Sequence, residues 1–158
     1  MLSNSQSTAT PNPFQQMINI TSSDNGWTYI NTSQTTAFGQ NVEFFYANGT
    51  IIPSWLENYT SGHAIWWVKT GSIAASSTLT IYMGFASKTT NLFNNKTTGE
   101  APQLSSTYAE YDDGANVFTD YWNFAGTSLP SGWGEMADFK CDVIAYPRWK
   151  GKSVNGMD

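Results

Sequence analysis

Apolar and polar residues alternate along several short runs of this chain, a pattern that is typical of half-buried β-strands. The run "TLTIYMGFA", residues 78–86, shows the alternation most cleanly. Its apolar positions are all odd-numbered: Leu79, Ile81, Met83 and Phe85. We therefore expect one strand here, with its apolar face buried and its other face, which carries Tyr82, turned outward.

Two further segments predict strands on the same grounds. In "FQQMINI", residues 14–20, the apolar Phe14, Ile18 and Ile20 share one parity, which leaves Asn19 on the outward face. The stretch "NVEFFYANGTIIPSWLENY", residues 41–59, predicts a hairpin around Asn48-Gly49, because this dipeptide favours the positive φ angles of tight hairpin turns. Pro53 lacks a backbone N–H, so it marks an edge or a strand end on the return leg.

The run "HAIWWVK", residues 63–69, carries two consecutive tryptophans on opposite faces of one predicted strand. Trp66 shares its parity with Ala64 and Val68, so we expect it in the core. Trp67 lies on a mixed face between Ile65 and Lys69, which belongs outside or under a covering segment.

Short strands separated by turns predict an all-β fold: an antiparallel β-sandwich of jelly-roll type with little helix. Residues 1–12 form a polar N-terminal arm, and residues 13–121 hold the predicted sandwich. Residues 122–158 either add strands to this sandwich or begin a truncated second domain. Residues 87–107 are polar and rich in turn-forming residues, and are expected to form loops.

Composition narrows the range of functions. The formal net charge is −5 and only 12% of residues are charged, so the chain has no basic stripe to neutralise the phosphates of nucleic acid. No run approaches the roughly 20 apolar residues of a membrane span, so we expect no membrane insertion. The single cysteine, Cys141, excludes an internal disulfide. Aromatic residues reach 15%, a content that argues against disorder.

Five Asn-x-Ser/Thr sequons favour a glycoprotein at the cell surface or outside the cell. The acceptor asparagines are Asn19, Asn31, Asn48, Asn58 and Asn95. The alternative is that a chain so rich in Asn, Ser and Thr generates them by chance. Residues 1–16 lack the charged and apolar regions of a signal peptide, so either the protein is not secreted or this sequence is a mature form with an added Met. The sequons favour the second alternative.

The order of three motifs resembles a domain-of-unknown-function family of archaeal and bacterial surface proteins. The motifs are "NVEFFYANGTIIPSWLENY", "AIWWVKTGSIAASSTLTIYMGFAS" and "NVFTDYWNF", and the resemblance covers roughly residues 14–121. Such domains often adjoin concanavalin-like lectin domains, and "YWNFAGTSLPSGW" is similar to the opening of one. The resemblance implies a β-sandwich in an extracellular setting and supplies no catalytic residues.

Catalytic signals are weak, so we expect that the protein is not an enzyme. His63 is the only histidine, and no Gly-x-Ser-x-Gly nucleophile elbow accompanies it. Glycoside hydrolysis needs two facing carboxylates, and Glu43 with Glu57 across the predicted hairpin is one candidate pair. No cofactor is expected; Ca²⁺ held by Asp112, Asp113 and Asn116 is the alternative to a plain Asp-Gly turn.

The aromatic residues offer the best candidate ligand site. Trp67 is the outward-facing member of its pair, Tyr82 is a candidate cross-strand neighbour, and Trp55 and Trp27 lie in or near loops. A flat aromatic platform suits stacking against a sugar. It also suits a protein interface, and the third alternative is that a second layer simply covers Trp67.

These observations favour a non-catalytic extracellular module that contacts glycan or protein, with carbohydrate preferred. The first alternative is a structural subunit of an extracellular filament or surface layer, in which the N-terminal arm is donated as a strand to a neighbouring copy. The second alternative is a glycoside hydrolase-like enzyme.

Overall fold

The computed structural model describes residues 1–33, 35–133, 141–143 and 149–151, and confirms the predicted all-β class. The chain divides into two compact units, Met1–Tyr121 and Trp122–Asp158. Helical structure in the first unit is confined to the 3₁₀ turn η1 (Trp27–Tyr29) and the single-turn α1 (Gly114–Val117) among the described residues.

A four-stranded sheet forms one layer of the first unit. Its strand order is β2 (Phe14–Thr21), β6 (His63–Thr70), β5 (Ser54–Tyr59) and β9 (Thr98–Glu100). The first three strands are antiparallel, as expected, but β9 runs parallel to β5, so the sheet is mixed. The parallel pair arises because a long connection, residues 60–97, carries the chain away before β9 returns beside β5.

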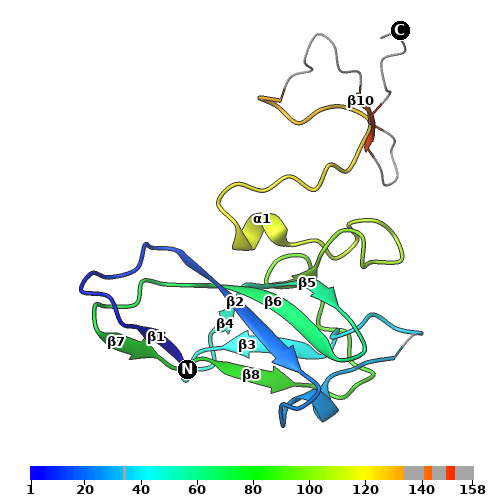
Figure 1. Cartoon of the computed structure of the whole chain (residues 1–158). Coiled ribbons are helices and arrows are strands. Elements are labelled where there is room, and N and C mark those ends of the chain that lie inside the picture. The colour runs from blue at the N-terminus through cyan, green and yellow to red at the C-terminus, as the bar shows by residue number, and fades with distance from the viewer. Residues whose placement is uncertain (34, 134–140, 144–148, 152–158) are drawn as a thin grey trace, which may run out of the picture. The chain divides into compact units, whose positions relative to one another are not determined.

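A three-stranded antiparallel sheet forms the facing layer (Figure 1). Its order is β4 (Ile51–Ile52), β3 (Val42–Phe45) and β8 (Tyr82–Phe85). The two sheets bury one shared core. From β6, Ala64, Trp66 and Val68 point inward, and the Trp66 ring meets Phe44 of β3 edge-on at 6.1 Å.

The prediction for Trp66 is therefore confirmed: only 2% of its surface is exposed. Burial of one large apolar side chain contributes about 1.5–3 kcal/mol. The parity of β2 is confirmed as well, because Ile18 and Ile20 pack against the core while Asn19 is exposed.

The predicted hairpin forms at Asn48-Gly49, where the Tyr46 N–H donates to the Thr50 carbonyl at 2.9 Å. Only Gly49, with φ +83°, takes a positive φ, and not both turn residues. Pro53 ends the return strand, as its missing N–H predicted. The chain then crosses from β4 in one sheet to β5 in the other.

The single strand expected over residues 78–86 is wrong: it is two strands in two sheets. β7 (Ser77–Leu79) pairs with β1 (Leu2–Asn4), and β8 pairs with β3. Thr80 and Ile81 lie between them, where the chain changes partner. The alternation itself survives the break, because Leu79 and Ile81 are half-buried and Thr80 is exposed.

The N-terminal arm lies on its own unit. Besides the β1–β7 pairing, the buried Asn4 amide donates to the carbonyls of Thr8, Ile73 and Ala74 at 2.8–3.1 Å. This side chain ties residues 1–8 to the loop before β7. A donated-strand filament would require β1 to leave this pairing.

The second unit is described over residues 122–133, β10 (Cys141–Val143) and β11 (Trp149–Gly151), which pair antiparallel. Trp133 meets the rings of Trp122 and Phe124 edge-on at 5.6 and 5.2 Å. No helix in the described part of the chain is long and apolar enough to cross a bilayer.

Candidate functional site

A row of outward-facing residues crosses the four-stranded sheet at one register level. The row runs from Met17 on β2 through Trp67 on β6 and Trp55 on β5 to Gly99 on β9. Two of the four tryptophan and tyrosine residues predicted to bind ligand are therefore direct cross-strand neighbours. Met17 is 44% exposed, whereas both tryptophans are half-buried.

The side chain of Trp67 already contacts residues of its own unit. Its indole Nε1–H donates to Glu57 Oε2 at 2.7 Å, and its ring meets Phe118 at 5.6 Å. Phe118 comes from the segment after α1, which lies over this face of the sheet (Figure 1). This corresponds to the alternative in which a second layer covers the tryptophan.

Trp55 is held in the same way. Its Nε1–H donates to Asp112 Oδ1 at 3.1 Å, and the same oxygen accepts the Tyr121 hydroxyl at 2.8 Å and the Gly114 N–H at 3.0 Å. Phe118 and Tyr121 meet the Trp55 ring edge-on at 5.3 and 5.8 Å. Asp112 is thus a clamp that fixes residues 111–121, which we call the covering segment, to the sheet.

Asp113, next to this clamp, is 1% exposed, and neither carboxyl oxygen has a hydrogen-bond partner among the described residues. Burial, followed by the negative charge of Asp112, raises the pKa of Asp113 to about 8. The Asn116 side chain, the third predicted Ca²⁺ ligand, donates instead to the Asn95 carbonyl at 3.2 Å. The part of the chain that is described holds no group of three His, Cys, Asp or Glu residues suited to a metal.

Tyr82 is not a neighbour of Trp67, contrary to expectation. It lies on β8 in the other sheet, opposite Phe45, and their rings stack at 5.8 Å. The expectation failed because the chain changes sheets between β7 and β8. Tyr82 is 46% exposed on that outer face.

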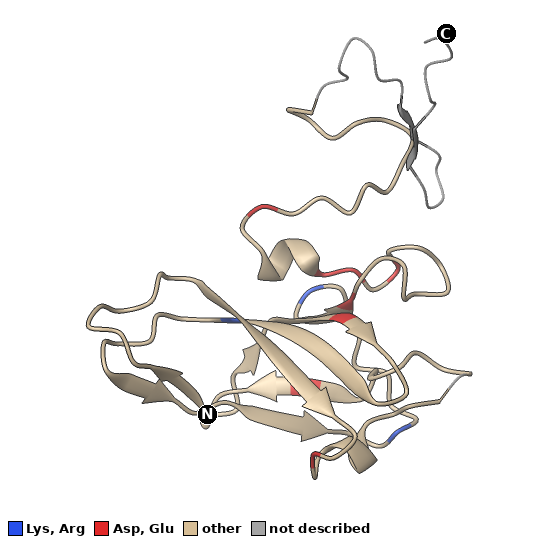
Figure 2. Ribbon diagram, in the orientation of Figure 1, with Lys and Arg blue, Asp and Glu red and all other residues tan. Residues whose placement is uncertain are grey.

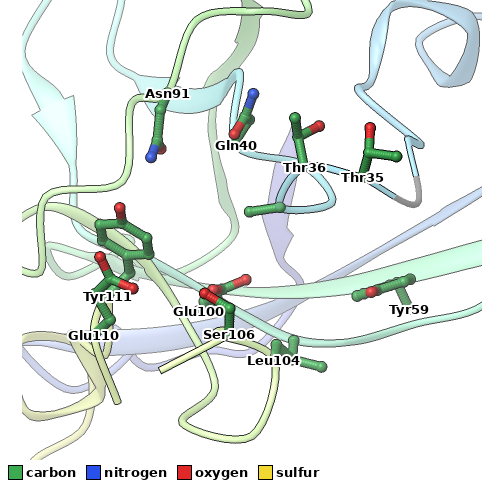
Figure 3. A pocket seen from close by; sticks show the side chains of 11 residues that line it. Thr35, Thr36, Gln40, Tyr59, Asn91, Glu100, Leu104, Ser106, Glu110 and Tyr111 are labelled. Atoms are coloured by element: carbon green, nitrogen blue, oxygen red, sulfur yellow. The ribbon is translucent and has the colours of Figure 1, made fainter. Parts of the chain in front are cut away.

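A polar cleft lies beside the C-terminal ends of β5 and β9, which point the same way because the two strands are parallel. β9 ends at Glu100, opposite Leu56, and β5 continues to Tyr59; both Tyr59 and Glu100 line the cleft. Residues 35–40 form one wall, and residues 104–111 form another. We call this space, of about 440 Å³, the Glu100 cleft (Figure 3).

Polar side chains dominate the lining of the Glu100 cleft. The lining residues are Thr35, Thr36, Ala37, Gln40, Tyr59, Asn91, Glu100, Leu104, Ser106, Glu110 and Tyr111. All but Ala37 and Leu104 carry a side-chain oxygen or nitrogen. Several are fixed by the protein itself: Gln40 Nε2 donates to the Lys88 carbonyl at 3.2 Å, and Asn91 Oδ1 accepts the Phe93 N–H at 3.0 Å. The polar groups are thereby oriented before any ligand arrives.

Glu100 has an unusual position for a carboxylate. It lies level with Leu56 and Trp66 on the core-facing side of the sheet and is 1% exposed. Its Oε1 accepts the Ser105 hydroxyl at 2.7 Å, while Oε2 is buried without a hydrogen-bond partner among the described residues. Burial raises the pKa of Glu100, the Ser105 bond lowers it, and the charge of Glu110 raises it further.

A second cleft, of about 400 Å³, is lined by Trp27, Thr32, Phe38, Tyr59, Thr60 and Ser61. We call it the Trp27 cleft. Tyr59 lines both clefts and stacks on Phe38 at 4.1 Å with an angle of 4° between the rings. Trp27 is therefore the predicted ligand residue that the structure places at a cleft, together with two aromatic rings that were not singled out.

Comparison with protein families matches residues 38–136 to a domain of unknown function, DUF2341. The match covers more than half of the chain. The chain belongs to the DUF2341 family. The predicted membership in a domain-of-unknown-function family is thereby confirmed.

This DUF2341 chain is also similar to "Uncharacterized protein 562" of Sulfolobus islandicus rod-shaped virus 1. The two are 37% identical over 127 residues, which is 77% of this chain and 21% of the viral protein. The chain thus spans about a fifth of the length of this relative. The search of solved structures found no match.

The DUF2341 match includes every lining residue of the Glu100 cleft except Thr35, Thr36 and Ala37. Sequence reasoning missed this cleft because its residues come from segments that read as polar loops. The signal in the sequence was slight: Glu100 stands in "TTGEA", a run too short to show a period. Only the pairing of β9 with β5 reveals that this acid faces inward.

Four of the five sequon asparagines of this DUF2341 chain are exposed: Asn19, Asn48, Asn58 and Asn95. Asn31 differs, because it is 3% exposed and its Nδ2 donates to Thr36 Oγ1 at 2.8 Å and to the Ala37 carbonyl at 2.9 Å. A glycan on this nitrogen would displace both bonds. Asn31 is therefore the least accessible of the five predicted acceptors in the folded chain.

The candidate catalytic residues of the sequence lie apart from the Glu100 cleft lining. Glu43 is on β3 and Glu57 is on β5, so the expected pairing of these two acids across one hairpin is wrong. The error arose because the return leg changes sheets at Pro53. His63 opens β6, where its Nδ1 and Thr60 Oγ1 lie 2.9 Å apart.

Proposed function

We propose that this DUF2341 chain is a non-catalytic carbohydrate-binding module of an extracellular or cell-surface protein, and that the Glu100 cleft holds the sugar. The polar and pre-oriented lining of this cleft carries the proposal. Hydroxyl, amide and carboxylate groups match the alternating donors and acceptors of a sugar, and the cleft volume lies in the range of small-ligand sites.

The Trp27 cleft supports binding of more than one sugar unit. Tyr59 joins it to the Glu100 cleft, and the ring of Trp27 adds aromatic surface that suits the apolar face of a pyranose ring, while the buried Phe38 stacks behind Tyr59. The four exposed sequons and the scarcity of charge (Figure 2) support an extracellular setting.

A filament subunit is the weaker proposal. Its donated strand would be β1, which pairs with β7 of its own chain and is anchored through Asn4. Sugar binding at the Glu100 cleft requires no such exchange.

Filling the cleft tests the proposal directly. Ser106 is exposed, lines the cleft, and makes no hydrogen bond among the described residues, so Ser106→Trp adds bulk without removing a contact. We expect this variant to bind a glycan found on an array at least about tenfold more weakly, a loss of 1.4 kcal/mol, in calorimetric titration. Thr107→Trp is the matched control, since Thr107 is the exposed neighbour outside the lining.

Equal loss in both variants, or none in either, would show that the sugar binds elsewhere. Trp67→Ala distinguishes the Glu100 cleft from the face of the sheet that carries Trp55 and Trp67. It should lower thermal stability and leave the affinity for sugar intact, because Trp67 is hydrogen-bonded to Glu57 and packed against Phe118. Shortening of the bound oligosaccharide over time would overturn the non-catalytic part of the proposal.

A further inference from the structure

The Glu100 cleft contains acidic groups without basic counterparts. Glu100 and Glu110 are among its lining residues, and no Lys or Arg is. The Tyr111 hydroxyl, which also lines the cleft, interacts with Glu110; this hydrogen bond is the largest cause that raises the pKa of Tyr111. The cleft thus concentrates negative charge next to neutral hydrogen-bonding groups.

Glu100 carries a carboxylate oxygen that could accept a hydrogen bond from a ligand. Ser105 satisfies one of its oxygens, but Oε2 is buried without a partner in the described residues. A buried polar atom that lacks a hydrogen bond costs about 1–3 kcal/mol, more when it is charged. Proteins usually pair buried carboxylates, so an inward-facing Glu whose buried Oε2 lacks a partner at the wall of a cleft marks a place for a donor from outside the chain.

The repulsion between the two acids favours a cationic donor. The charge of Glu110 disfavours the charged form of Glu100, so the two carboxylates destabilise each other in the empty cleft. A positively charged ligand group between them would relieve this repulsion and supply the missing hydrogen bond. An anionic sugar, such as a uronic acid, would increase the repulsion.

We propose that the Glu100 cleft selects sugars that carry a free amino group, with the carboxylates of Glu100 and Glu110 receiving the ammonium. This inference rests on the proposed carbohydrate-binding function and names its ligand class. An ammonium offers three donors and one positive charge, and the hydroxyls of the same sugar meet the Thr, Asn and Gln groups of the lining. A metal ion fits less well, because the described residues provide no group of three suitable ligands.

The experiment compares two tetrasaccharides that differ only in acetylation: the glucosamine tetramer and the N-acetylglucosamine tetramer. Both are titrated into the full chain at physiological ionic strength. We expect the amine form to bind at least about tenfold more tightly, since hydrogen bonds to charged groups contribute about 1.5–3 kcal/mol. Glu110→Gln should reduce this ratio to below about threefold.

Asp120→Asn is the matched control, because it removes the same charge from an exposed residue outside the cleft, and it should keep the tenfold ratio. Loss of the ratio in Asp120→Asn, or its persistence in Ser106→Trp, would show attraction of a polycation to an acidic protein and overturn the inference. Binding of Ca²⁺ that displaces the amine sugar and depends on Glu110 would overturn it as well.

Failure of the inference and of the proposed function give different results. If the acetylated tetramer binds as tightly as the amine form and Ser106→Trp weakens both, the cleft binds sugar without selecting the amine. If neither tetramer nor any glycan on an array binds in a Ser106-dependent way, the carbohydrate function itself is wrong.

Discussion

Two carboxyl groups, those of Asp113 and Glu100, are almost completely buried in a unit that has few charges. Burial raises the pKa of both, that of Asp113 from 3.8 to about 8. Between about pH 4 and about pH 8, the folded chain therefore holds a proton on Asp113 that the unfolded chain releases. Stability from this source is complete below about pH 4 and is lost as the pH rises to about 8.

Asp113→Asn should make stability less dependent on pH. The amide is neutral at every pH, so it removes the cost of charging a buried acid. The free energy of unfolding should fall between about pH 5 and about pH 8.5 in the wild type. We expect this fall to be smaller in the variant by at least about 1.4 kcal/mol, the equivalent of one pKa unit. Chemical denaturation at both pH values measures the difference.

Asp120→Asn controls for the change in net charge, because Asp120 is exposed on the same segment. Some pH dependence should persist in Asp113→Asn, since Glu100 shifts in the same direction. A wild-type chain that is more stable at the higher pH would contradict the assignment of Asp113 as a buried, protonated acid.

At this scale the sequence predicted apolar burial better than polar burial. Parity alone placed Trp66 inside, because it stands between Ala64 and Val68 on an eight-residue strand. Nothing equivalent exists for Glu100, whose strand has three residues, or for Asp113, whose neighbours Asp112 and Gly114 indicated an exposed turn. Their burial depends on contacts that are made only after distant segments meet.

Among the elements, β9 lies in very close contact with residues 111–113. Gly99 lies at its centre, and a Cβ at this position would collide with the Tyr111 carbonyl oxygen and the Asp113 carboxyl. The same covering segment receives the backbone of β9, since the Glu100 N–H donates to the Tyr111 carbonyl at 3.0 Å. The close approach depends on the missing side chain.

Gly99→Ala should therefore destabilise the protein by about 1–3 kcal/mol and weaken sugar binding, because a backbone carbonyl cannot move aside like a side-chain end. Thermal unfolding and titration with the glycan measure the two effects. Gly71→Ala is the comparison: no atom lies within 4 Å of its added Cβ, and we expect a change below about 0.5 kcal/mol. Similar losses in both variants would indicate that chain stiffness, not the close approach, matters.

The long alternating strands were predictable, and the short ones were not. Over eight residues, β2 and β6 repeat the period often enough to identify them. β9 is too short for this, and its parallel pairing with β5 depends on a long connection that has no local signal. The change of sheet between β7 and β8 was hidden for the opposite reason, because the alternation continues through it.

For the whole molecule, the described contacts assign the covering segment to the first unit. The buried residues of the main core cluster lie between Ile30 and Phe93, Phe118 covers Trp55 and Trp67, and Tyr121 covers Trp55. We expect residues 1–121 alone to fold in one cooperative transition, seen by calorimetry, with sugar affinity retained.

A chain ending at residue 110 is the informative comparison. It still contains the sequence of every strand in the two facing sheets, but it lacks Asp112 and the covering rings of Phe118 and Tyr121. We therefore expect it to lose most of its free energy of unfolding. Failure of residues 1–121 to fold would show that residues 122–158 complete the same domain.

The lining of the Glu100 cleft comes from four separated parts of the chain, residues 35–40, 59, 91 and 100–111, and this has a kinetic consequence. The β5–β6 hairpin closes a short loop and can form early, whereas β9 must find β5 after the intervening chain has collapsed. We expect the cleft to be among the last features completed during folding. A chain trapped before that step would be rich in β-structure, with Trp66 already sheltered from solvent, and still be unable to hold a ligand. Ligand binding would therefore report that folding is complete, whereas spectroscopic measures of strand content would not distinguish this trapped chain from the native one.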